Sequence, residues 1–212
     1  MTDSAKQEKP YVTLGGEGTA TIEEKRSKFI GYAAHVASET EAQAFVKRIK
    51  AKHHDARHNV FAYVLGDTVQ RYSDDGEPQG TAGIPVLDVL RKSGVTDACI
   101  VVTRYFGGIL LGAGGLVRAY TAAAKAALDA AGTLTMERYT EFRLRLSYAD
   151  YQKLSAKLAA LGAVTDAVEY GGEVTLDVAL KATDADRFAD AVQELFCGRV
   201  PIEVRGERYD AR

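Results

Sequence analysis

The segment RYFGGILLGAGGLVRAY, residues 104–120, places five glycines between an apolar run and an alanine-rich stretch. Arg104 and Arg118 flank the glycines, and the segment contains no acidic residue. The glycines can allow a strand and a helix to pack closely. Alternatively, they can leave main-chain N–H groups free at the start of the helix, where an anion can bind. Both explanations are compatible with the sequence, and both require a strand–loop–helix unit at this place.

The same segment lacks the two common nucleotide-binding signatures. No Lys-Ser or Lys-Thr pair follows the glycines, as a P-loop requires. A dinucleotide fingerprint starts at Gly112, but Val117 stands where its third glycine belongs. The aromatic residues Tyr105, Phe106 and Tyr120 offer a surface on which a base could stack.

A second glycine-bounded helix start follows an acidic turn in RYSDDGEPQGTAGIP, residues 71–85. Three carboxylates, Asp74, Asp75 and Glu77, fall within four positions directly after Ser73. Such a cluster can hold Mg²⁺ through one or two oxygens and waters, or it can be an ordinary acidic turn. Thr81 lies among the glycines that open the next helix, which makes this a second candidate anion site.

The histidines give a weaker signal than the glycines. His54 and His58 are four residues apart, but the helix that carries the first is expected to end near Asp55. We therefore expect no metal site, and we expect His58 to lie in a loop near the acidic turn. The run KRIKAKHHDARH, residues 47–58, forms a local basic patch.

Hydrophobic periodicity predicts an α/β (α+β) first part with mixed strand pairing. Ser38 and Glu41 form a capping box for a helix that buries Ala42, Phe45 and Ile49. The run ACIVVTRYF predicts a strand buried on both faces. Other strands are expected near residues 11–14, 18–24, 28–36, 59–66 and 69–72, and helices near 84–93 and 113–131.

A break near residues 132–140 separates a second part with the order strand-helix-strand-strand-helix-strand. Ser147 and Thr183 are predicted to cap its two helices. Gly171-Gly172 predicts a tight hairpin that needs positive φ, and Pro201 predicts that the last strand lies at a sheet edge. We place the domains at residues 1–137 and 138–212.

The composition is that of a globular, cytoplasmic protein. A net charge of −2 over 212 residues argues against bulk affinity for nucleic acid but permits a local basic patch. The apolar runs are shorter than the ~18 residues that span a bilayer, and the polar first ten residues predict a tail, not a secretory signal. Cys99 and Cys197 are predicted to be buried free thiols. We expect no cofactor, no metal and no membrane contact.

Four stretches together resemble the YigZ/IMPACT family: RSKFIGYAAHV, HDARHNVFAYVLGD, RYSDDGEPQGTAGIPVLDVL and VVTRYFGGILLGAGGLVRAYTAAAKAAL. They span roughly residues 18–131, and the remainder is similar to the small C-terminal domain of bacterial two-domain members. The resemblance implies a ribosomal protein S5 domain-2-like fold followed by a ferredoxin-like βαββαβ domain. Elongation factor G contains domains similar to both.

The resemblance also implies a role in translation. Eukaryotic relatives, which carry a different accessory domain, restrain a translation-control kinase by competing for its activator protein. The family supplies no catalytic residues. We therefore expect a binding protein that regulates translation by contacting RNA, the ribosome or a translation-associated protein. A Mg²⁺-dependent enzyme acting on a phosphorylated substrate and an interaction module without an anion ligand remain alternatives.

The candidate residues fall into two groups. The expected anion- or nucleic-acid-binding residues are Arg104, Tyr105, Gly107, Gly108, Gly112, Gly114, Gly115, Arg118, Thr81 and His58. The acidic turn contributes Ser73, Asp74, Asp75 and Glu77.

Overall fold

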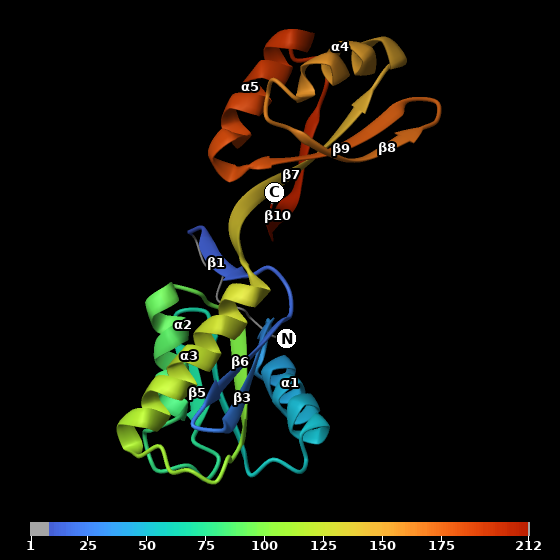
Figure 1. Ribbon diagram of the computed structural model, residues 1–212. Helices are drawn as coiled ribbons and strands as arrows, with labels where there is room; N and C mark the ends of the chain where they lie inside the picture. Colours follow the sequence, from blue (N-terminus) through green and yellow to red (C-terminus); the bar gives the residue numbers. More distant parts are fainter. Residues whose placement is uncertain (1–8, 212) are drawn as a thin grey trace. The chain divides into compact units, whose positions relative to one another are not determined.

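The computed structural model describes residues 9–211, which form two compact units (Figure 1). One unit is built from Tyr11–Thr135 and the other from Met136 onward. The tail predicted for the first ten residues lies almost wholly outside the described residues. Within the described part of the chain, no helix is long and apolar enough to cross a bilayer.

The first unit contains a five-stranded sheet and three helices. The strand order is β2-β3-β6-β4-β5, and every neighbouring pair is antiparallel. The elements are β1 (Tyr11–Leu14), β2 (Gly18–Glu24), β3 (Ser27–His35), α1 (Glu39–Lys52), β4 (His58–Leu65), β5 (Val69–Ser73), α2 (Gly83–Ser93), β6 (Ala98–Tyr105) and α3 (Ala113–Ala131).

The expectation of mixed pairing in this sheet is wrong, and the position of β6 explains why. The strands β3 and β4, which α1 connects, run in the same direction, because each pairs antiparallel with β6 between them. The last strand in sequence is thus inserted at the centre of the sheet. Residues Ala98–Arg104 of β6 are all buried, which confirms the predicted strand with two covered faces.

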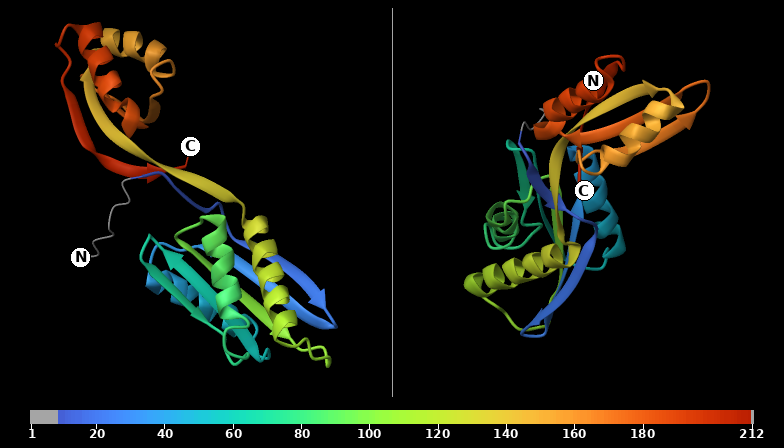
Figure 2. Two further views of the ribbon diagram at one scale, coloured as in Figure 1. Left: turned by 90° about the vertical axis from the view of Figure 1, so that its left-hand side faces the viewer. Right: turned by 90° about the horizontal axis from the view of Figure 1, so that it is seen from above.

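Helices cover both faces of this sheet (Figure 2). On one face, α2 and α3 enclose a core that includes Phe29, Ile100 and Tyr120. On the other face, α1 packs its apolar side on the sheet around Cys99. The predicted capping box at the start of α1 is confirmed, because the Glu41 amide donates to Ser38 Oγ and the Ala37 amide donates to Glu41 Oε2.

The alanine-rich composition of α3 reflects its close approach to two strands. A Cβ placed on Gly31 of β3 would lie 2.5 Å from the Ala123 carbonyl oxygen. A Cβ on Gly18 of β2 would lie 2.4 Å from the Ala127 carbonyl oxygen. Glycines on the sheet and alanines on the helix therefore let the two backbones pack together.

The second unit has the predicted βαββαβ order and a sheet with order β10-β7-β9-β8 (Figure 1). Its elements are β7 (Thr133–Leu146), α4 (Tyr148–Leu158), β8 (Val164–Tyr170), β9 (Val174–Lys181), the 3₁₀ turn Ala182–Asp184, α5 (Ala185–Phe196) and β10 (Ile202–Asp210). Both helices pack on one face of the sheet, around a core that includes Leu144, Leu154, Leu176 and Phe188. β10 pairs only with β7, so its predicted edge position is confirmed.

The cap predicted at Ser147 is confirmed, since the Asp150 amide donates to Ser147 Oγ. Thr183, in contrast, lies inside a 3₁₀ turn, and Asp184 occupies the N-cap of α5. The Gly171-Gly172 hairpin forms without positive φ at either glycine. Cys197 is exposed and not buried, because it ends α5 in a left-handed conformation with φ of 51°.

The boundary between the two units falls between Thr135 and Met136, inside the predicted break over residues 132–140. Gly132 ends α3, as expected, with φ of 66°. From Thr133 onward the chain enters β7 and stays extended as far as Leu146. The first residues of β7 belong to the first unit, where β1 pairs with this strand.

Candidate anion-binding site

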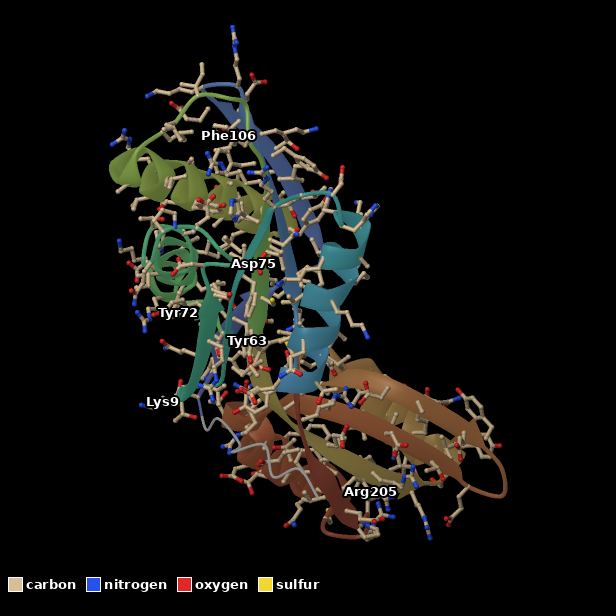
Figure 3. All side chains as sticks on the ribbon, turned by 90° about the horizontal axis from the view of Figure 1, so that it is seen from below. Lys9, Tyr63, Tyr72, Asp75, Phe106 and Arg205 are labelled. Carbon is tan, nitrogen blue, oxygen red and sulfur yellow. The ribbon has the colours of Figure 1, made fainter. Side chains whose placement is uncertain are left out.

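Four connections meet at one end of the first sheet. The end of β6 lies between the start of β3 and the start of β4. The register shows this, because Arg104 is opposite Phe29 of β3 on one side and His58 of β4 on the other. The start of β4 in turn faces the end of β5, through Phe61↔Ser73. This end therefore carries the β2–β3 turn, the α1–β4 loop, the acidic turn and the glycine loop. Figure 3 shows Phe106, which directly follows β6, at this end.

The first turn of α3 has open main-chain donors. The N-cap is Gly112, and no side chain caps the helix. The first helix amide with a partner is that of Leu116, which donates to the Gly112 carbonyl at 3.0 Å. Among the described residues, the amides of Ala113, Gly114 and Gly115 have no hydrogen-bond acceptor, and Ala113 and Gly114 are exposed. These amides have the geometry that holds an anion at a helix start.

Arg118 lies over this open turn. Its Nη1 atom is 3.6 Å from the position that a Cβ on Gly114 would occupy. The side chain is exposed and forms no ion pair with another described residue. A guanidinium at this place adds a full positive charge to the partial charge of the helix start.

The five glycines of the segment have different tasks. Gly107 is a packing residue, because a Cβ there would lie 2.1 Å from the Arg26 carbonyl carbon, and its amide donates to Ser27 Oγ. Gly108 and Gly112 have φ of 85° and 71°, which L side chains rarely adopt. Gly114 supplies an open amide, and so does Gly115, although a Cβ there would meet Leu111 at 2.9 Å. Both explanations given for the segment therefore apply, each to different glycines.

Arg104 does not lie free beside the open amides, as its place in the sequence had suggested. Its side chain is 7% exposed, and Nη1 donates to Glu77 Oε1 at 2.7 Å. The same carboxylate oxygen accepts from the Tyr120 hydroxyl at 2.7 Å. Burial, followed by the Glu77 charge, raises the pKa of the Tyr120 hydroxyl. Arg104 and Tyr120 thus anchor the acidic turn in the core, and the cation beside the open helix start is Arg118.

The acidic turn uses its carboxylates inside the protein. Asp74 accepts from the amides of Gly80, Ala82 and Gly83 at 2.9, 3.1 and 2.7 Å, and so occupies the start of α2. Asp75 accepts from the Asn59 amide and from Lys50 Nζ. Together with the Glu77 contacts, this is the arrangement of a structural turn. No group of acidic, histidine or cysteine side chains that could hold a metal ion occurs among residues 9–211.

The other predicted residues near this turn are also engaged. Ser73 Oγ accepts from the Asp75 amide, and Thr81 Oγ1 donates to the Pro78 carbonyl. His58 Nδ1 is 2.9 Å from the Asp75 carbonyl oxygen, so His58 lies beside the acidic turn as expected, although at the start of β4. Each of these three side chains thus has a hydrogen-bond partner within the acidic turn or the loop that follows it.

A network around His53 was not foreseen from the sequence. The Tyr105 hydroxyl donates to Asp55 Oδ1 at 2.8 Å, so it accepts from His53 Nδ1–H at 2.9 Å. His53 Nε2 then accepts from the Tyr32 hydroxyl at 2.7 Å. Burial lowers the pKa of His53, and the charges of Lys52 and Lys28 lower it further. Tyr105 is therefore held by this network and its hydroxyl is not free for a ligand.

Exposed cations without ion pairs gather at the same end of the unit. Within the described chain, Lys25, Arg26, Lys28, Lys52, Arg57 and Arg118 are exposed and have no carboxylate partner. The exposed acids nearby are Glu23, Glu24 and Asp55. This end is consequently the positive part of a chain whose net charge is −2, and a local positive field attracts polyanions.

The loop between β6 and α3 also exposes large apolar side chains. Phe106, Ile109 and Leu110 are 49%, 42% and 82% exposed. The Phe106 ring lies 5.5 Å from the Arg104 guanidinium, which fixes its position. Exposed apolar groups in the middle of a basic surface are typical of a contact with a partner.

Comparison with known families gives two matches along the chain. The family described as "Impact N-terminal domain" matches residues 25–128. The "Domain of unknown function (DUF1949)" matches residues 144–199. The first match contains the whole of the basic end, including the open start of α3.

Individual relatives are similar over almost the whole chain. "IMPACT family member YvyE" of Bacillus subtilis is 36% identical over 195 residues, 91% of this chain and 90% of that protein. "IMPACT family member YigZ" of Escherichia coli is 39% identical over 188 residues, 87% and 92% of the two chains. A solved structure titled "Crystal structure of an hypothetical protein" has a TM-score of 0.62 and 36% identity, covering 92% of this chain and 97% of that one.

A eukaryotic relative matches less than half of this chain. The "Protein IMPACT homolog" of Dictyostelium discoideum is 40% identical over 98 residues, which are 43% of this chain and 28% of that protein.

Proposed function

The chain belongs to the IMPACT family, and we propose that it is a binding protein of translational regulation whose open α3 start contacts RNA phosphates. The observation that carries this proposal is the set of three partnerless amides, Ala113, Gly114 and Gly115, with Arg118 above them. A phosphate at this place would accept from the amides and from the guanidinium together. RNA, alone or within the ribosome, presents such phosphates in a row.

The surrounding charges support a polyanion over a single small anion. The unpaired cations on the β2–β3 turn and after α1 lie at the same end of the sheet as the glycine loop and would contact further phosphates of the chain. Each cation that neutralises a phosphate releases a counterion, so the affinity depends steeply on salt. The exposed ring of Phe106 is available for stacking on an unpaired base.

The test measures binding of a fluorescein-labelled single-stranded oligouridine, and separately of ribosomes, over a series of KCl concentrations. We expect the logarithm of the binding constant to fall linearly with the logarithm of the salt concentration. Arg118→Ala should weaken binding by about tenfold and lower the salt slope by about one. Lys125→Ala is the matched control, because Lys125 is an exposed cation on the same helix, paired only with Asp129.

Two results would contradict the proposal. One is wild-type binding that does not respond to salt. The other is an Arg118→Ala chain that binds as tightly as the Lys125→Ala chain. Either result would remove the start of α3 from the function.

One observation favours a protein partner at the same end as a second candidate. Leu110, at 82% exposed, and Ile109 are aliphatic, and aliphatic side chains contribute little to RNA binding. A translation-associated protein with an acidic rim and an apolar pocket would use them together with the cations. Leu110→Ser should leave oligouridine binding unchanged and weaken ribosome binding if this candidate is correct.

A further inference from the structure

A groove lies on the other face of the first sheet, away from the two helices α2 and α3. Its volume is about 490 Å³, and it is lined by side chains of α1, β4 and β5. Among residues 9–211, α1 is the only helix on this face, and it packs around Cys99 and Tyr63, which leaves the groove beside it. Apolar side chains nearer to the β5 edge, including Phe61 and Val69, remain only partly buried.

The lining of this groove combines an apolar floor with a positive rim. Val46, Phe61 and Tyr63 form the floor, and Lys47, Lys50 and Arg71 stand around it. No acidic residue lines the groove. Lys47 has no ion pair within the described chain, and Arg71 is 61% exposed at 3.7 Å from Glu39. A ligand for this surface therefore has apolar groups beside negative charge.

The groove opens beside the edge of the sheet. Within the described chain, β5 pairs only with β4, so one row of its main-chain N–H and C=O groups faces away from the sheet. An edge of this kind can accept an additional strand from another chain. Alternate side chains of an added strand would point to the α1 side and enter the groove. In Figure 3, Tyr63 on β4 and Tyr72 on β5 mark this part of the sheet.

The aromatic rings of the groove do not suit nucleic acid. Phe61 and Tyr63 stack on each other with ring centroids 6.2 Å apart and an interplanar angle of 8°. Tyr63 is only 4% exposed, so its face is not available to a base. A peptide uses both the strand edge and the floor, whereas RNA would use only the cations.

We propose that this groove binds an extended acidic segment of a partner protein, which pairs with β5 and inserts apolar side chains against Phe61. The site is separate from the start of α3, which lies on the opposite side of the sheet among different residues. The groove would give the chain a second partner. The recognised segment of that partner would alternate acidic and apolar residues. Affinity comes from main-chain pairing. Lys47 and Arg71 select against basic segments, whereas Lys50 is already paired with Asp75 at 2.7 Å.

The test uses the whole chain and two synthetic peptides. The first alternates glutamate with valine and phenylalanine, and the second has lysine in place of each glutamate. Fluorescence anisotropy should show binding of the acidic peptide and at least tenfold weaker binding of the basic one. Hydrogen exchange should slow at the amides of Val69–Ser73 when the acidic peptide is bound.

Charge reversal identifies the surface. The double variant Lys47→Glu with Arg71→Glu should lose at least tenfold in affinity for the acidic peptide. The double variant Lys92→Glu with Lys125→Glu has the same net charge and changes exposed positions outside the groove, so it should bind as the wild type does. Arg118→Ala should also bind the peptide normally, which separates this result from that of the RNA experiment.

Several outcomes would overturn the proposal. Equal binding of both peptides, no binding at millimolar concentration, or full binding by the Lys47→Glu, Arg71→Glu variant would each do so. Displacement of the peptide by oligouridine in the Arg118→Ala chain would assign the groove to RNA. Analytical sedimentation could instead show that the free chain is a dimer and that the Lys47→Glu, Arg71→Glu variant is a monomer. That result would assign the groove to a second copy of this chain.

Discussion

The starts of α2 and α3 have similar sequences, but their main-chain amides differ in whether they have a hydrogen-bond acceptor. Both follow glycines, neither has an acidic residue in its first turn, and neither N-cap residue caps with its own side chain. At α2 the carboxylate of Asp74 accepts from three amides. At α3 the corresponding amides have no acceptor among the described residues.

The comparison shows that glycines before a helix leave amides able to bind an anion. Whether a carboxylate of the protein itself accepts from them depends on the sequence of the preceding turn. Asp74 precedes Gly83, the first residue of α2, by nine residues, so a tight turn can bring its carboxylate back to the helix start. The segment before α3 contains apolar residues and no acid. The carboxylate of Asp74 therefore stabilises the first helix start, while the open amides of the second carry the proposed ligand site.

The largest expected effect comes from removing the internal anion of α2. Asp74→Ala should lower the free energy of unfolding by about 3 kcal/mol, because three amides lose a charged acceptor. Urea unfolding followed by circular dichroism measures the change. Asp88→Ala, on an exposed part of the same helix, is the control and should cost under about 0.5 kcal/mol. A similar cost for both variants would contradict the assignment of Asp74 as the cap.

A second stability effect separates the packing glycine from the others. Gly107→Ala should cost about 2 kcal/mol, because its Cβ would lie 2.1 Å from main-chain atoms of Arg26. Gly16→Ala is the comparison, since Gly16 has no atom within 4 Å of its Cβ position. Thermal unfolding of the two variants tests this. If Gly107→Ala unfolds at the wild-type temperature, the close contact of the two loops is not required.

Supplying α3 with its own anion should make it resemble α2. Ala113→Asp places a carboxylate in the first turn, which should stabilise the chain by about 0.5 kcal/mol and weaken oligouridine binding at least tenfold. Ala122→Asp is an equal charge change at an exposed position in the middle of the helix. It should cost about 0.5 kcal/mol in stability and retain most of the binding. Equal losses of binding would mean that only net charge matters.

The last expected effect concerns Gly114, whose exposed amide has no acceptor among the described residues. Gly114→Ala should raise the free energy of unfolding by about 0.8 kcal/mol, because alanine has the higher helix propensity. The Cβ meets only Arg118 Nη1, at 3.6 Å. A stabilised variant that binds oligouridine less tightly would show that the glycine serves the ligand at a cost in stability. A destabilised variant would show that Gly114 is a packing residue instead.

Most elements of the fold could be predicted from sequence, since each has a local pattern. The buried face of α1 around Phe45 follows from helical periodicity, and its start follows from Ser38 and Glu41. The pairing in the first sheet could not be predicted, because it depends on where β6 inserts. The exposure of Cys197 could not be predicted either, since an apolar helix gave no sign that its last turn ends in a left-handed residue.

The candidate site was predicted less completely than the fold. The sequence indicated an anion-ready helix start, and the open amides after Gly112 agree with that geometry, while binding itself stays a prediction. Sequence spacing could not show that Arg104 pairs with Glu77, because 27 residues separate them. The acid and the arginine were assigned to two separate candidate sites, whereas they form one buried pair. The hydrogen bonds around His53 have the same long-range origin and left no local signal.

The insertion of β6 has a consequence for the order in which the chain can assemble. Until residues 98–105 leave the ribosome, β3 and β4 have no common neighbour, and each presents apolar faces and unpaired edges to solvent. Folding of this unit must wait for the strand that is made last, so it closes long loops late and is slow for its size. We therefore expect the nascent chain to expose the edges of β3 and β4 during synthesis, and a fragment ending at Asp97 should fail to fold.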